Sequence, residues 1–160
     1  MADIPREMMA SGRPEDQSFD DEELLYRRFA PDLLDGDEIA IAAVELPDMS
    51  IIREKYGRPQ WLLLDEDYAD WGVLAFHVRD IPPNRAVWHE GVVAYVLEPR
   101  HVPYRNNYPH SEVWAYREGE HICRSANNLH LLEPDFHLRW RECIVLASRV
   151  AIHPKRRDPA

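Results

Sequence analysis

The alternation of apolar and polar residues is clearest in the second half of the chain, where it predicts β-strands. Residues 71–79 and 91–98 are rich in β-branched and aromatic side chains, which favour the pleated backbone of a strand. Residues 111–117 and 120–124 flank a short link that contains glycine, a spacing typical of a hairpin. This half of the chain therefore predicts a group of strands that pair with one another.

A helix is predicted close to the C-terminal end, from residue 134 to about residue 147. It opens with a proline, which is tolerated in the first turn because the missing N–H has no partner there. Apolar residues then recur at helical spacing and form a single stripe: Phe136, Trp140, Cys143, Ile144 and Ala147. Residues 149–153 predict one more short strand after the helix.

The first half of the chain has weaker patterns. Residues 38–46 are apolar on both faces, which predicts a buried central strand. Residues 50–56 and 60–70 each favour a short helix. Residues 20–30 fit a short helix with acidic residues in its first turn, or a strand over residues 24–29, and we place the helix first.

These elements together predict an α+β fold in a single domain over residues 20–153. We expect a mainly antiparallel sheet of about four to six strands, with the C-terminal helix packed on one face. Strands at residues 38–46, 71–79 and 91–98 are expected inside the sheet, because both of their faces are apolar. A length of 160 residues suits one domain with its own core.

Charge changes the picture at the two ends of the chain. The net charge is −10, and residues 1–38 carry a net −8 of it, so the remainder is almost balanced. Residues 1–19 mix proline, glycine and charge without apolar periodicity, which predicts a disordered acidic leader that the fold does not need. Residues 154–160 predict a basic tail. Because nucleic-acid binding needs lysine or arginine against phosphate, this balance disfavours RNA or DNA as a partner without excluding a local basic patch.

Other features of the composition indicate an intracellular protein. No apolar run approaches the roughly 18–20 residues of a transmembrane helix, and the first residues lack the pattern of a secretory signal, so we expect a cytoplasmic location and no membrane partner. Cys123 and Cys143 do not form a CxxC pair, and we interpret them as reduced core residues.

Candidate chemistry gathers in residues 98–119. A loop with two prolines, residues 103–109, leads into a predicted strand on which His110 and Glu112 share a face. On a strand their Cα atoms are roughly 6–7 Å apart, close enough for the imidazole and the carboxylate to interact. Such a pair serves proton transfer when the carboxylate orients the base, and it also occurs as a purely structural pair.

Cationic and aromatic residues around this stretch predict a ligand site. We assign ligand-binding roles to Arg53, Tyr104, Arg105, Asn107, Tyr108 and Trp114. Arginine presents a rigid fork of donors that suits phosphate, and a second basic set precedes the loop in sequence: Arg27, Arg28, Arg53 and Lys55. These cations fit a phosphate-bearing ligand, or simply ion pairs with the acidic leader.

No motif predicts a metal or a cofactor. The chain has no GxGxxG, no P-loop and no GxSxG, and the single Cys123 does not complete a deaminase zinc motif. Four histidines and Glu112 lie in neighbouring predicted strands or loops, but none of their spacings is typical of zinc ligands: His89, His101, His110 and His121. We therefore predict a site without metal or cofactor.

Four segments resemble a small bacterial family of uncharacterised proteins. They are an LYRR start at residues 25–28, an SxxREKY segment at 50–56, a GVxxFxVxDIP segment at 72–82, and an NYxHSE block at 107–112. The chain departs from this pattern at residues 51–52, where two isoleucines replace one apolar and one polar residue. The resemblance covers about two thirds of the chain and implies no activity, although it suggests that separate polar clusters meet in the fold.

Two hypotheses about function follow. The first is a noncatalytic accessory module of a bacterial system, which binds a protein partner or a small phosphate-bearing ligand through residues 101–116. Tyr104, Tyr108 and Trp114 carry this hypothesis, because exposed tyrosine and tryptophan are enriched at binding hot spots.

The second hypothesis is a metal-independent phosphodiester hydrolase of the RNase type. In it His110 is the general base, Glu112 orients the imidazole, and Arg53 or Arg105 stabilises the charge on phosphate. The enzyme needs His110, Glu112 and an arginine in one cleft, whereas the module needs only an exposed aromatic surface.

Overall fold

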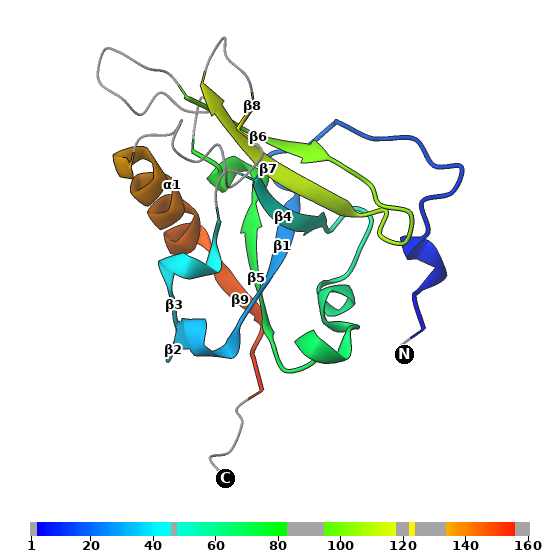
Figure 1. Cartoon of the computed structure of the whole chain (residues 1–160), viewed down its shortest axis with the longest axis horizontal. Coiled ribbons are helices and arrows are strands. Elements are labelled where there is room, and N and C mark those ends of the chain that lie inside the picture. Colours follow the sequence, from blue (N-terminus) through cyan, green and yellow to red (C-terminus); the bar gives the residue numbers. More distant parts are fainter. Residues whose placement is uncertain (1–2, 46–47, 83–94, 118–121, 124–133, 156–160) are drawn as a thin grey trace.

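The computed structural model describes residues 3–45, 48–82, 95–117, 122–123 and 134–155. Within these residues one antiparallel sheet and one α-helix form the body of the protein (Figure 1). The strands of the sheet are β1 (Leu24–Phe29), β4 (Asp48–Arg53), β5 (Gly72–His77), β6 (Tyr95–His101), β7 (His110–Arg117), β8 (Ile122–Cys123) and β9 (Arg149–Ile152), and the helix is α1 (Pro134–Ala147). The predicted α+β class is confirmed.

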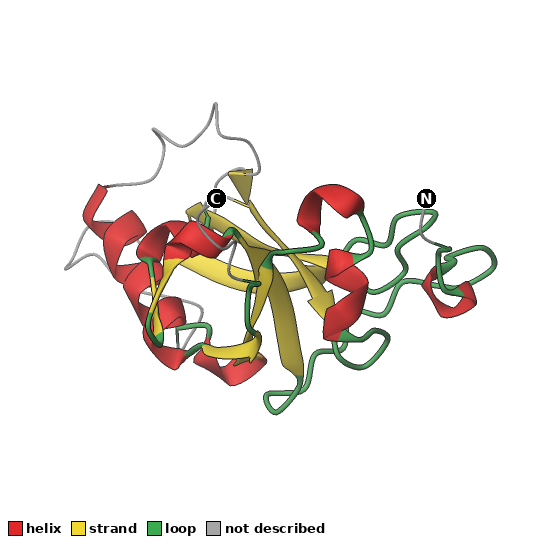
Figure 2. Cartoon of the chain, turned by 90° about the horizontal axis from the view of Figure 1, so that it is seen from below, coloured by secondary structure: helices red, strands yellow, loops and turns green. Residues whose placement is uncertain are grey.

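The sheet has the strand order β6-β7-β4-β1-β5-β9, and β8 pairs with the far end of β7. Every pairing is antiparallel. A separate two-stranded sheet joins β2 (Leu34–Asp35) to β3 (Glu38–Ile39). The helix α1 lies on one side of the large sheet and the 3₁₀ helices η4 (Pro59–Leu63) and η5 (Glu66–Tyr68) lie on the other (Figure 2).

Each face of the sheet has its own apolar cluster, which follows from the period of two along a strand. The larger cluster lies on the side of α1, where Trp140 and Ile144 of the helix are completely buried against Leu25 and Val113. The smaller cluster lies on the side of η4, where Ile52 packs with residues of the neighbouring strands. Burial of both faces accounts for the apolar composition of the strands.

Several predicted elements of the first half are wrong in type. Residues 24–29 form the strand β1 rather than a helix, because pairing with both β4 and β5 satisfies the backbone of this segment. Residues 48–53 form β4, where a short helix was predicted. Residues 38–46 are not a central strand: β3 is followed by the 3₁₀ helix η3 (Ile41–Ala43), and Ala43 and Val44 pack into the core beside α1.

The second half agrees better with the pattern. The helix α1 has the predicted bounds, and β5 lies inside the sheet between β1 and β9 as expected. The segment at residues 91–98 is described only from Tyr95, and β6 stands at one end of the strand order rather than inside it. The predicted short helix at residues 60–70 is formed by η4 and η5.

Residues 3–19, for which a disordered leader was predicted, lie against the ends of β6 and β7 in this structure. Backbone hydrogen bonds join Ala10 to Arg105 and Met8 to Tyr108, and the segment runs past the ends of β6 and β7 (blue in Figure 1). The physical reason is the fully buried guanidinium of Arg53, which donates to the carbonyls of Asp16 and Ser18. Of the predicted basic tail, only Pro154 and Lys155 are described.

Candidate functional site

His110 opens β7, and both nitrogens of its ring have hydrogen-bond partners. Nδ1 is 2.7 Å from the carbonyl oxygen of Val102. Because a carbonyl can only accept, Nδ1 carries the hydrogen and Nε2 of the neutral ring is an acceptor. The hydroxyl of Ser50, 2.7 Å away on the neighbouring strand β4, therefore donates to Nε2.

The surroundings of His110 favour its neutral form. The residue is only 4% exposed, and Tyr104 stacks on its ring with a centroid distance of 3.8 Å. Burial lowers the pKa of the imidazole below its ordinary value, and this effect outweighs the hydrogen bond to Val102 and the nearby charge of Glu112, which raise the pKa. Ser50, in contrast, is exposed to solvent. The pair thus combines a buried neutral base with an accessible hydroxyl.

This pair lies in the wall of a cavity of about 390 Å³, which we call the His110 pocket. Residues of the strands β1, β4 and β7 meet there with residues of the loop before β7. Its polar and aromatic wall consists of Arg27, Arg28, Glu45, Ser50, Tyr68, Trp71, Tyr104, Asn107 and His110. Arg27 and Glu45 form an ion pair at 3.2 Å, so their charges cancel. Arg28 therefore gives the wall of this pocket a net positive charge.

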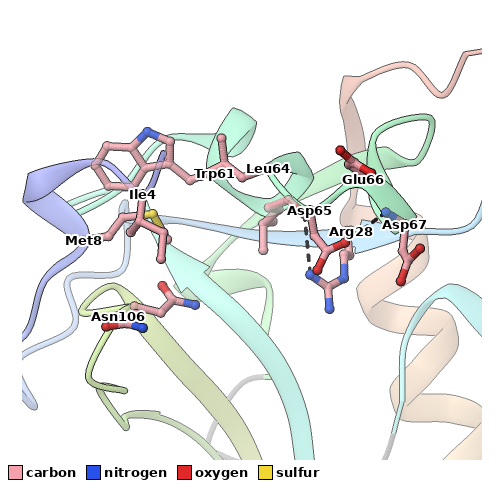
Figure 3. Close-up of a pocket in the computed structure, with 11 residues that line it drawn as sticks. Ile4, Met8, Arg28, Trp61, Leu64, Asp65, Glu66, Asp67 and Asn106 are labelled. Atoms are coloured by element: carbon pink, nitrogen blue, oxygen red, sulfur yellow. Dashed lines mark hydrogen bonds between the residues drawn. The ribbon is translucent and has the colours of Figure 1, made fainter. Parts of the chain in front are cut away.

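A second cavity of about 660 Å³ adjoins the first, and Arg28, Leu62 and Asn107 line both. We call the second cavity the Trp61 pocket. Figure 3 shows its division into two ends, with Ile4, Met8 and Trp61 gathered at one end and the side chain of Arg28 at the other, beside acidic residues. The acidic residues are Asp65, Glu66 and Asp67.

Arg28 is well placed to serve both pockets. Its guanidinium lies 3.6 Å above the ring of Tyr68, which fixes the plane of the side chain. The bond from its Nη1 to the carbonyl of Leu62 is long, at 3.5 Å, so with respect to the described residues most of the donor capacity of the guanidinium remains for a ligand. Asn107 adds a buried side-chain oxygen that has no hydrogen-bond partner among the described residues.

Glu112 does not orient His110, contrary to the sequence-based hypothesis. The two residues share a face of β7, but both ring nitrogens of His110 are engaged by Val102 and Ser50. Glu112 pairs in register with Ser50 on one side and Arg100 on the other, and it is not part of the wall of the His110 pocket. The backbone carbonyl of Val102 has the orienting role that we assigned to the carboxylate.

The other predicted binding residues are divided between three places. Tyr104 and Asn107 both line the His110 pocket, and Tyr104 is 53% exposed. Arg105 is exposed but lines neither pocket. Tyr108 and Trp114 are 3% and 8% exposed, which excludes them as exposed anchors of a binding surface.

Arg53 belongs to a separate cluster that holds the leader, and we call this cluster the leader clamp. It consists of Asp16, Glu23, Arg53, Lys55, Tyr56, His101 and Tyr108. The guanidinium of Arg53 donates to both oxygens of Glu23 and is 3.8 Å from the ring of Phe19. Arg53 therefore cannot reach a phosphate in the His110 pocket.

His101 is the central imidazole of the leader clamp. The backbone N–H of Asp16 donates to its Nδ1 at 2.8 Å, so the hydrogen is on Nε2, which donates to the carbonyl of Tyr108 at 2.7 Å. Burial lowers the pKa of His101 below its ordinary value. The hydrogen bond from Lys55 is the largest cause of a strongly lowered pKa of Asp16, and further bonds from Ser18 and Tyr56 add to it.

Sequence reasoning missed Ser50 and Trp61 as site residues. Ser50 was missed because its segment was predicted to be helical, whereas a strand places its side chain on one face of the sheet, beside side chains of the neighbouring strand. Among the described residues no group of three or more His, Cys, Asp or Glu side chains could hold a metal ion, and no helix is long and apolar enough to cross a membrane. His89 and His121 lie outside the described residues.

No family model, no curated protein and no solved structure matches the chain.

Proposed function

We propose that the protein is a binding module for a small phosphate-bearing ligand with an aromatic or apolar part, such as a nucleotide. The observation that carries this proposal is the position of Arg28 in the shared wall of the His110 and Trp61 pockets. A ligand that fills both pockets passes the guanidinium, and guanidinium–phosphate pairs are among the strongest hydrogen bonds in proteins.

The two pockets offer different surroundings to the two parts of such a ligand. The apolar end of the Trp61 pocket, formed by Ile4, Met8 and Trp61, suits a base or another flat apolar group. The three acidic residues of the same wall repel phosphate and accept hydrogen bonds from amino or hydroxyl groups. Phosphate is therefore expected on the side of the His110 pocket, near Arg28.

The experiment is calorimetric titration of the full chain with AMP, adenosine and inorganic phosphate. We expect AMP to bind more tightly than either fragment, and Arg28→Ala to weaken AMP at least tenfold, which corresponds to about 1.4 kcal/mol. Trp61→Ala is expected to weaken AMP and adenosine but not phosphate.

A matched control removes the same charge elsewhere. Arg139 is exposed on α1 and lines neither pocket, so Arg139→Ala should bind AMP as wild type does. Equal losses in the two arginine variants would mean that only the overall charge matters, and the proposal would be wrong. Absence of AMP binding by the folded wild-type chain would also contradict it.

A further inference from the structure

The hydroxyl of Ser50 has the geometry of an activated nucleophile. It is accessible in the wall of the His110 pocket, and it donates its only hydrogen to Nε2 of a neutral imidazole at 2.7 Å. Nucleophilic serines are activated in this way by a base that removes the proton during attack. A Ser–His bond between neighbouring strands is often only a packing feature, but here Ser50 is an exposed residue in the wall of a pocket while the base is buried.

The base itself is held in the tautomer that this chemistry needs. The carbonyl of Val102 fixes the hydrogen on Nδ1, and the stacked ring of Tyr104 limits rotation of the imidazole. In serine hydrolases a carboxylate on Nδ1 has this orienting role and also stabilises the imidazolium. A carbonyl supplies the orientation and a smaller part of the charge stabilisation.

We propose that Ser50 is a nucleophile with His110 as its general base, and that the pocket hydrolyses a phosphodiester through a phosphoseryl intermediate. This inference rests on the proposed function, because the phosphate held near Arg28 is the group that Ser50 attacks. It gives Nδ1 of His110 the carbonyl of Val102 as its orienting partner in place of Glu112, and it makes Ser50 the nucleophile, a residue absent from the sequence-based RNase hypothesis.

The reaction balances in two steps. In the first, the oxygen of Ser50 attacks phosphorus, its proton moves to Nε2 of His110, and the bond from phosphorus to the leaving oxygen breaks, with the proton passing from Nε2 to the leaving alkoxide. In the second, water attacks the phosphoseryl group, His110 takes its proton and returns it to the oxygen of Ser50. The products are a phosphate monoester and an alcohol. Arg28 stabilises the charge of the phosphoryl oxygens in both steps.

The test uses bis(p-nitrophenyl) phosphate, which has no 2′-hydroxyl group. Wild type is expected to release p-nitrophenolate, and Ser50→Ala to reduce the rate by at least 100-fold, which is the usual range for loss of such a group. A fluorophosphonate should label wild type at Ser50, as located by mass spectrometry of its peptides. Ser50 is exposed, so Ser50→Ala is expected to fold normally, and circular dichroism checks this.

Ser148→Ala is the matched control, because Ser148 donates to the carbonyl of Ile144 at the end of α1 and lines neither pocket. It should keep both the turnover and the labelling of Ser50. His110→Gln should lower the labelling rate at pH 7 by at least tenfold. Turnover by wild type should rise with pH and reach its plateau below the ordinary histidine range, since burial lowers the pKa of His110.

Failure of this inference can be told apart from failure of the proposed function. If wild type binds AMP but shows neither turnover nor labelling, the nucleophile is wrong and the binding module stands. If labelling occurs at Ser50 without AMP binding, Ser50 is a nucleophile and the proposed binding module for nucleotides is wrong. If RNA is cleaved while bis(p-nitrophenyl) phosphate is not, and Ser50→Ala keeps that cleavage, His110 acts directly on a 2′-hydroxyl and the inference is overturned.

Discussion

His101 and His110 stand at the facing ends of β6 and β7, and they differ in a single partner. Both are buried, and each donates from one ring nitrogen to a backbone carbonyl. The second nitrogen of His101 accepts from the backbone N–H of Asp16, whereas that of His110 accepts from the hydroxyl of Ser50. One histidine is thus connected only to the main chain, and the other is connected to an accessible side chain in a pocket.

The difference teaches that burial and a lowered pKa do not identify a functional histidine. Burial lowers the pKa of both residues. The two histidines are distinguished by the partner of their second ring nitrogen. A backbone donor makes His101 part of the leader clamp, and a hydroxyl in a cavity wall makes His110 part of a candidate site. The following experiments separate the two regions, beginning with the largest expected effect.

Deletion of residues 1–19 should destabilise the protein strongly. It removes the carbonyls of Asp16 and Ser18 from the buried Arg53, and the donor of Asp16 from His101. A buried charge that loses partners costs about 3–5 kcal/mol, so we expect a fall in Tm of roughly 10 °C or more, measured by circular dichroism. A synthetic peptide of residues 1–19 should restore part of the Tm, and an unchanged Tm would show that the leader is dispensable.

Arg53→Met should have the next largest effect, at about 3–5 kcal/mol of unfolding free energy in urea titrations, because Glu23 then stays buried without its cation. The comparison is Arg79→Met, which breaks an exposed ion pair with Glu22. That variant should lose less than about 1 kcal/mol. Similar losses in the two variants would contradict the structural role of the leader clamp.

Replacement of the two histidines should separate stability from site chemistry. His101→Leu leaves the N–H of Asp16 and the carbonyl of Tyr108 without a partner, and each such loss costs about 1–3 kcal/mol. We also expect faster proteolysis within residues 3–19. His110→Gln should cost about 1–2 kcal/mol and leave the leader protected. Protease cleavage followed by mass spectrometry measures the difference, and equal exposure of the leader in both variants would contradict it.

Stability should fall as the pH is lowered from about 7 to 5. His101 and His110 have lowered pKa values in the folded state, so the unfolded chain binds protons first, near its ordinary pKa of about 6.5. Their contribution is complete above that pH and is lost below it, by at most about 1.4 kcal/mol per pH unit and residue. Urea unfolding at several pH values tests this, and the slope should be smaller in His101→Leu.

Tyr104→Ala should have the smallest effect on stability, below about 1 kcal/mol, because Tyr104 is about half exposed. It removes the stacked ring from His110 and therefore opens the imidazole to water. The NMR titration of His110 should then move toward the ordinary pKa, while that of His101 stays in place. A shift of both titrations would mean that the two regions are coupled.

The elements that the sequence predicted correctly are those whose signal is local. The β-branched and aromatic residues of β5, the hairpin strand β7 and the proline-opened helix α1 can be read from a few neighbouring residues. His110, Tyr104 and Asn107 were predicted together because they are close in one loop and strand, and all three line the His110 pocket. Glu112 was paired with His110 on the same local ground, and this pairing is wrong because both ring nitrogens have partners from other segments.

The remaining features depend on contacts between distant segments. Short sequences such as residues 24–29 and 48–53 carry no decisive period, and only pairing within the sheet makes them strands. Ser50 and His110 are 60 positions apart and meet through the antiparallel register of β4 and β7. The leader has no apolar pattern, and a buried cation more than 30 positions away holds it in place. The sequence by itself determined the α+β class and the location of the polar stretch, because these depend on local periodicity, and tertiary structure decided which polar groups meet.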